Sequence, residues 1–153
     1  MKWSVFLPGS QWIPNLDAMS ILGLPIWFTE MDVYSTNEFV RANDLEVMLR
    51  EAFAHPIVEG IMLWGFWELM SKEHGHLHLV DWDQTPNEAG KRFISLNKEW
   101  TTNVKSHTNH EGQFKFRGFN GTYEVEDSVH SREIKLAFTI DKGESPIVVE
   151  ICL

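Results

Sequence analysis

Two short, almost uninterrupted apolar runs flank one amphipathic helical pattern, and this order limits the fold most. The runs are residues 25–33, "PIWFTEMDV", and residues 60–67, "GIMLWGFW". Strands this apolar are covered on both faces, as in parallel sheets. The helix expected over residues 37–55 ends before Pro56, and Asn87 is a suitable N-cap for a second helix over residues 88–100. The sequence therefore predicts a βαβα unit with parallel strands and right-handed crossovers.

Apolar side chains recur at helical spacing in both expected helices. The stripe of the first consists of Leu45, Met48, Leu49, Ala52 and Phe53, and that of the second of Phe93, Leu96 and Trp100. Before this unit, residues 1–15 are expected to be irregular and residues 16–22 to end a helix, with Gly23 at its C-terminal side.

A polar linker, residues 103–111, separates this unit from the remainder of the chain. Residues 112–153 contain four short segments of strand character, and Asn120-Gly121 is typical of a hairpin turn. We expect a small antiparallel β unit over residues 112–153.

The charge balance excludes several classes of partner. The chain has 22 acidic and 13 basic residues and a formal net charge of -9, which is unsuited to binding a nucleic-acid backbone or an anionic membrane surface.

The single cysteine of the chain, Cys152, cannot form an internal disulfide. No apolar run reaches the roughly 20 residues of a membrane span, and Pro8 interrupts the first apolar run too early for a signal peptide.

Two acids, Glu30 and Asp32, end the first apolar run. Chemistry in parallel α/β folds sits at the carboxyl ends of the strands, and alternation would point both side chains to one side. Paired acids beside tryptophans are typical of glycosidic-bond chemistry, and the chain has seven tryptophans. The alternative is structural, because strand ends lie near water and an Asp there often caps a turn. From the residues alone, both interpretations stay open.

Four segments of the chain resemble glycoside hydrolase family 10, the endo-1,4-β-xylanases, most closely the plant members. They are "LGLPIWFTEMDVYS", "REAFAHPIVEGIMLWGFWE" with "NEAGKRF", and "GQFKFRGFNGTYEVE". The resemblance runs from about Leu16 to the C-terminus. It implies a partial (β/α)8 TIM barrel over residues 16–102, comprising the last two βα units, followed by the small β extension. Residues 1–15 match nothing in the family.

The resemblance also implies roles for four residues. Glu30 takes the position of the nucleophile in retaining hydrolysis, and Asp32 that of a supporting acid. Trp64 matches a tryptophan that stacks on sugar, and Trp67 is expected to be a second platform. The substrate would be β-1,4-xylan or xylo-oligosaccharide, no metal or organic cofactor would be needed, and the location would be extracellular or in the cell wall.

The family's acid/base glutamate, on its fourth strand, has no counterpart here. The two Asn-Glu pairs, Asn37-Glu38 and Asn87-Glu88, open helices instead. We therefore expect barrel strands one to six to be absent, hydrolysis by the isolated chain to be negligible, and its open edges to favour self-association. The alternative function is a non-catalytic carbohydrate-binding or interaction remnant.

Two further motifs are interpreted as structural features and not as functional sites. His74, His76 and His78 alternate and could share one side of a strand as zinc ligands, but without a fourth ligand a solvated loop is favoured and no metal site is predicted. Asn120-Gly121-Thr122 is a glycosylation sequon, and the turn interpretation is sufficient for it.

Overall fold

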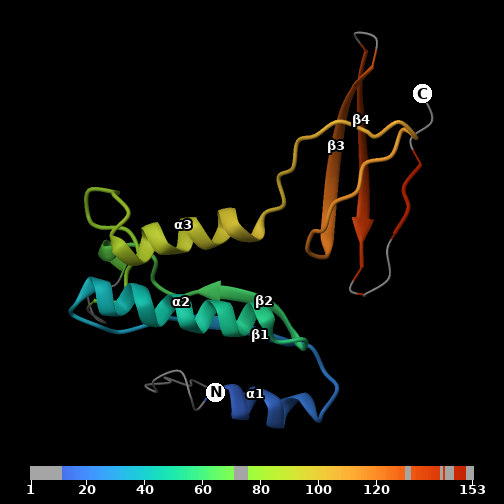
Figure 1. Cartoon of the computed structure of the whole chain (residues 1–153). Coiled ribbons are helices and arrows are strands. Elements are labelled where there is room, and N and C mark those ends of the chain that lie inside the picture. The colour runs from blue at the N-terminus through green and yellow to red at the C-terminus, as the bar shows by residue number, and fades with distance from the viewer. Residues whose placement is uncertain (1–11, 71–75, 130–131, 142, 144–146, 151–153) are drawn as a thin grey trace. The chain divides into compact units, whose positions relative to one another are not determined.

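The computed structural model describes residues 12–70, 76–129, 132–141, 143 and 147–150. The chain divides into two compact units, Met1–Lys98 and Glu99–Leu153. The elements in chain order are α1 (Trp12–Ser20), β1 (Ile26–Met31), α2 (Glu38–Ala54), β2 (Val58–Leu63), the short 3-10 helix η1 (Glu68–Met70), α3 (Glu88–Trp100), β3 (Gly121–Val129) and β4 (Arg132–Ile140) (Figure 1). Within the described residues, no helix combines the length and the apolar character needed to cross a membrane.

Strand β1 pairs with β2 in parallel, with α2 as the crossover between them. Asn37 caps α2, because its side-chain oxygen accepts hydrogen bonds from the N–H groups of Phe39 and Val40 at 3.0 and 3.3 Å. The buried side chains of α2 include Leu45, Leu49 and Ala52, as the apolar stripe predicted. Phe53 is the exception, since its side chain is exposed.

The pairing of β1 with β2 contains a bulge. Phe28 pairs with Ile61, and Met31 pairs with Leu63, so three steps along β1 match two steps along β2. One extra residue therefore lies in β1 between Phe28 and Met31, in the stretch that contains Glu30. Bulges of this kind redirect side chains and are frequent beside active sites.

Helix α3 begins where the sequence predicted. The Asn87 Oδ1 atom accepts hydrogen bonds from the N–H groups of Ala89 and Gly90 at 3.1 and 3.2 Å. Leu96 is buried, while Phe93 and Trp100 are half-buried. With β1–α2 and β2–α3 as two consecutive βα units on a parallel pair, the predicted α/β class with a partial barrel is confirmed.

The second unit contains one antiparallel ribbon, β3 with β4, paired from Gly121 opposite Ile140 to Val129 opposite Arg132. Phe116, Tyr123 and Phe138 pack their rings in series, with centroids 5.4 and 5.7 Å apart. The Tyr123 hydroxyl donates a hydrogen bond to the Phe119 carbonyl at 2.5 Å, which ties the approach segment to β3.

Three local predictions were wrong. Residues 12–15 are helical, since Pro14 lies in the first turn of α1, where its missing N–H costs nothing. Residues 113–119 and 147–150 are not strands, so Asn120-Gly121 opens β3 and does not join two strands. Strand β2 ends at Leu63, so Trp64 and Trp67 lie beyond it.

Candidate active site at the ends of β1 and β2

Glu30 is the next-to-last residue of β1 and its side chain is exposed. The N–H of Trp64 donates a hydrogen bond to the carbonyl of Met31 at 3.0 Å, which places Trp64 beside the end of β1. Trp64 is 46% exposed. Glu30 and Trp64 thus both lie at the carboxyl ends of the two parallel strands.

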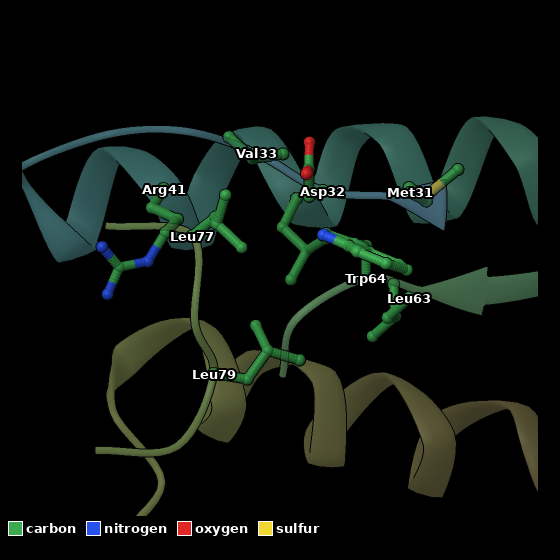
Figure 2. Close-up of a pocket in the computed structure, with 9 residues that line it drawn as sticks. Met31, Asp32, Val33, Arg41, Leu63, Trp64, Leu77 and Leu79 are labelled. Atoms are coloured by element: carbon green, nitrogen blue, oxygen red, sulfur yellow. The ribbon is translucent and has the colours of Figure 1, made fainter. Parts of the chain in front are cut away.

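Asp32 lines a small cavity of about 10 Å³ together with Trp64. Figure 2 shows the two side chains above an apolar floor; the other lining residues are Met31, Val33, Arg41, Leu45, Leu63, Leu77 and Leu79. Glu30 is not among the lining residues. A space of this size holds about one water molecule, so a saccharide would have to bind on the exposed surface around Trp64.

Arg41 is a buried cation that the sequence interpretation missed. It is 3% exposed, and its Nη1 group donates hydrogen bonds to the carbonyls of Ser35 at 2.8 Å and His76 at 3.1 Å. Burial lowers the pKa of Arg41, and the charges of Glu38 and Asp81 partly offset that effect. Arg41 therefore fastens the segment that follows β1 to the segment that follows β2.

A signal for Arg41 was present in the sequence. It precedes Leu45 by four residues, so it extends the apolar stripe of α2 by one turn. A charged residue on such a stripe needs buried carbonyl or carboxylate partners.

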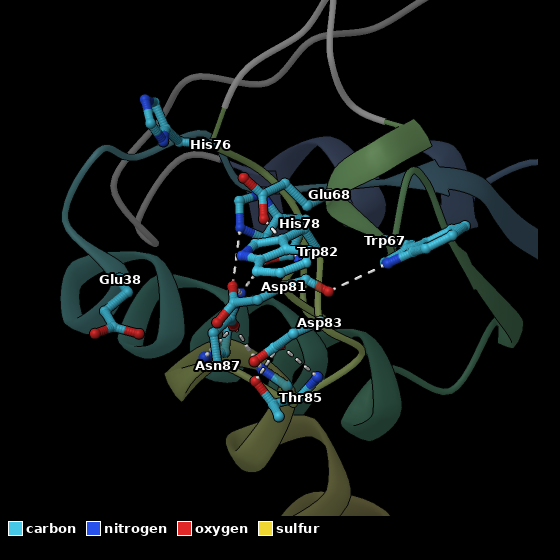
Figure 3. Close-up of polar contacts among 12 residues, drawn as sticks. Glu38, Trp67, Glu68, His76, His78, Asp81, Trp82, Asp83, Thr85 and Asn87 are labelled. Atoms are coloured by element: carbon cyan, nitrogen blue, oxygen red, sulfur yellow. Dashed lines mark hydrogen bonds and ion pairs between the residues drawn. The ribbon is translucent and has the colours of Figure 1, made fainter.

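Trp67 is half-buried and is held by a polar contact. Its indole Nε1 donates a hydrogen bond to the carbonyl of Asp81 at 3.2 Å, and its backbone forms an isolated bridge with Val80 (Figure 3). This contact fixes the ring against the loop that leads to α3.

The three histidines do not share one environment. His78 is buried, His76 is exposed and lies apart from it in Figure 3, and His74 falls outside the described residues. The alternative considered above, with all three on one side of a strand, therefore does not hold for His76 and His78.

A larger, open hollow of about 520 Å³ lies between α1 and the end of α2. Its lining includes Asp17, Glu51, His55 and Ile57. The carbonyl of Ile57 accepts a hydrogen bond from the N–H of Ile26 at 2.8 Å, so this hollow lies at the amino ends of the strands. In parallel α/β folds that end serves stability and the carboxyl end serves chemistry.

The sequence and the structure were both compared with those of known proteins. No family model matches the chain. Endo-1,4-beta-xylanase 2 of Arabidopsis thaliana is 55% identical over 139 residues, which is 90% of this chain and 13% of that protein. Endo-1,4-beta-xylanase 3 of the same plant is 53% identical over 139 residues, again 90% of this chain and 18% of the relative.

The chain therefore resembles a part of the xylanases of glycoside hydrolase family 10. It spans less than a fifth of the length of these two relatives, given the 13% and 18% coverage. Among solved structures, xylanase 10B from Thermotoga petrophila RKU-1 in complex with xylobiose is 22% identical, with a TM-score of 0.49, over 61% of this chain and 32% of that one. The predicted family, including its plant type, is confirmed by the identities to the plant xylanases.

Proposed function

We propose that this chain carries the nucleophile part of a retaining endo-1,4-β-xylanase site, with Glu30 as the nucleophile. The observations that support this most are the exposure of Glu30 in the bulged end of β1 and the exposed indole of Trp64 just after β2, whose backbone N–H is hydrogen-bonded to the carbonyl of Met31. Trp64 is the sugar-stacking platform and Asp32 the supporting acid. Trp67 as a second platform, and an extracellular or cell-wall location, stay predictions.

In this mechanism the ionised carboxylate of Glu30 attacks the anomeric carbon of a xylose unit. A glycosyl ester forms, and the bond from that carbon to the leaving oxygen breaks. Water then hydrolyses the ester and regenerates the carboxylate. The leaving oxygen needs a proton from a second acid, and general acid catalysis of this kind contributes roughly 10²–10⁴-fold.

Neither Asn-Glu pair supplies that acid. Both asparagines, Asn37 and Asn87, cap helices with their side-chain oxygens, and Glu38 and Glu88 form the first turns of α2 and α3. We therefore expect binding of xylan with very slow turnover by the 153-residue chain. The same observation favours the second candidate function, a non-catalytic carbohydrate-binding site on the same face.

A substrate that needs no acid tests the nucleophile directly. A fluorinated xylobioside with a dinitrophenyl leaving group releases dinitrophenolate unprotonated, and its fluorine slows hydrolysis of the ester. We expect one fluoroxylobiosyl group per chain in the intact mass, mapped by peptide sequencing to Glu30. Glu30→Gln should remove the adduct, while Glu59→Gln, an exposed carboxylate on β2, should leave it unchanged.

The two candidate functions give different results. An adduct on Glu30, formed about tenfold more slowly in Trp64→Ala, supports the hydrolase site. Xylo-oligosaccharide binding that Trp64→Ala weakens, with no adduct in the wild type, supports the non-catalytic site. If the wild type gives no adduct and no binding, or if Glu30→Gln is labelled equally, the proposal is wrong.

A further inference from the structure

Three side chains with metal-ligating atoms converge in the segment between β2 and α3. Glu68 comes from η1, and His78 and Asp81 come from the loop before α3 (Figure 3). Their ligand atoms all lie within 4.8 Å of one another. The Nε2 atom of His78 lies 3.2 Å from Oδ1 of Asp81, and His78 is only 9% exposed.

Hydrogen bonds hold the carboxylates of Asp81 and Glu68 and the backbone of His78 in place. The amide Nδ2 of Asn87 donates to Oδ1 of Asp81 at 3.2 Å and to the carbonyl of His78 at 3.0 Å. The backbone N–H of Trp82 donates to Oε2 of Glu68 at 2.8 Å. Supporting contacts to ligating side chains are a regular feature of metal sites, because they fix the direction of the donor atoms.

The charges in this cluster favour a cation. Two carboxylates face one imidazole, and like charges this close repel each other unless something neutralises them. The charges of Arg41 and Lys91 also act on Asp81, but Arg41 donates its Nη1 hydrogen bonds to the carbonyls of Ser35 and His76, and Lys91 donates to Glu88. A divalent ion among the three donors would replace repulsion by three ligand bonds.

The distances suit a small transition-metal ion. Two donors at about 2.0–2.2 Å from a tetrahedral ion are themselves about 3.4 Å apart, close to the observed separation of His78 and Asp81. A pair near the 4.8 Å limit must close by roughly 1.4 Å, which a half-buried glutamate can do by side-chain rotation. One imidazole with two carboxylates suits Zn²⁺ better than Ca²⁺ or Mg²⁺, which prefer oxygen ligands alone.

We propose that Glu68, His78 and Asp81 form a Zn²⁺ site, with water completing the coordination. The site joins η1, which follows β2, to the loop before α3. It does not depend on the proposed xylanase function, because Glu30, Asp32 and Trp64 are not among its ligands. It also differs from the alternating-histidine site considered above, since His78 is the one histidine in it.

Calorimetric titration of Zn²⁺ into the full chain, freed of metal by chelator and dialysed, tests the proposal at pH 7. We expect one equivalent bound with micromolar or tighter Kd and a rise in Tm that chelator reverses. Glu68→Gln and His78→Gln should each weaken binding at least tenfold. His76→Gln, an exposed histidine two residues away, is the matched control and should bind as the wild type does.

Glu68→Gln keeps the test valid if the buried His78 variant fails to fold, because Gln can still accept the Trp82 N–H. Co²⁺ provides a second readout, since visible absorption bands of tetrahedral intensity should appear in the wild type and vanish in Glu68→Gln. No heat and no Tm change in the wild type would overturn the proposal. Equal loss of binding in His76→Gln would also overturn it, in favour of a surface histidine site.

Discussion

At the scale of single residues, the side chain of Asn87 makes four hydrogen bonds. It is 5% exposed, and its side-chain oxygen caps α3 through Ala89 and Gly90. Its amide group simultaneously holds the carbonyl of His78 and the carboxylate of Asp81. Asn37 caps α2 in the same way, but its own hydrogen bonds are exposed. The two residues therefore form a matched pair, one cap with buried partners and one without.

We predict that Asn87→Ala lowers the free energy of unfolding by about 2–4 kcal/mol, the sum of a lost cap and unsatisfied buried partners. Asn37→Ala should cost about 1 kcal/mol, the value of a cap alone. Urea denaturation followed by tryptophan fluorescence measures both. Equal losses in the two variants would show that the buried contacts of Asn87 contribute nothing.

The sequence indicated some of the residues at the candidate site and missed others. Glu30 and Asp32 stood out because acids follow an apolar run, and the structure places both at a strand end. Arg41 was missed because its stabilising partners, the carbonyls of Ser35 and His76, come from segments distant from one another in sequence. Buried polar contacts of this kind depend on tertiary structure. In the sequence they appear only as a charged residue on an otherwise apolar helix face.

At the scale of elements, α3 is packed against the preceding loop through a glycine. A Cβ atom added to Gly90 would lie 2.1 Å from the carbonyl oxygen of Leu79 and 3.2 Å from Cβ of Pro86. The first of these is a backbone atom, which cannot move aside without shifting the loop that carries His78 and Asp81. The close approach of the Leu79 carbonyl therefore explains why a glycine lies in the first turn of α3.

We predict that Gly90→Ala destabilises the protein by about 1–2 kcal/mol, although alanine is favoured over glycine in helices by about 1 kcal/mol. Ser95→Ala, at an exposed position of the same helix, should instead be neutral or stabilise by a few tenths of a kcal/mol. Thermal unfolding monitored by circular dichroism compares the two variants. A Gly90→Ala protein more stable than the wild type would contradict the close packing.

Periodicity predicted the elements better than their pairing. Helices α2 and α3 and the parallel strands β1 and β2 follow from apolar spacing and from the caps Asn37 and Asn87. The bulge in β1 could not be predicted, because it arises from the register of two strands far apart in sequence. In the second unit, β3 and β4 pair with each other along their full length, and residues 113–119 contribute aromatic packing without forming a strand.

At the scale of the whole molecule, one face of the β1–β2 pair carries exposed apolar side chains. Trp27 pairs with Gly60 and its ring covers that glycine, while Met62 follows two residues later on the same side of β2. Trp27 is 56%, Met62 47% and Trp64 46% exposed. In the described part of the chain each of these strands also has one unpaired edge. Such a surface favours association.

We predict reversible self-association through this face, seen in sedimentation velocity as a sedimentation coefficient that rises with concentration. Met62→Lys should shift the protein toward monomer by placing a charge in the apolar face. Val47→Lys, at an exposed position of α2, should not. A wild type that stays monomeric at all concentrations, or an equal effect of both substitutions, would exclude this face as the cause.

The same face links association to the proposed function, because Trp64 is the proposed sugar platform. A xylo-oligosaccharide that covers Trp64 must then compete with a second copy of the chain for the exposed indole. Saturating xylo-oligosaccharide should therefore lower the sedimentation coefficient of the wild type and leave that of Met62→Lys unchanged. If sugar binds without affecting association, the two surfaces are separate, and the contacts between copies lie elsewhere on the sheet edges.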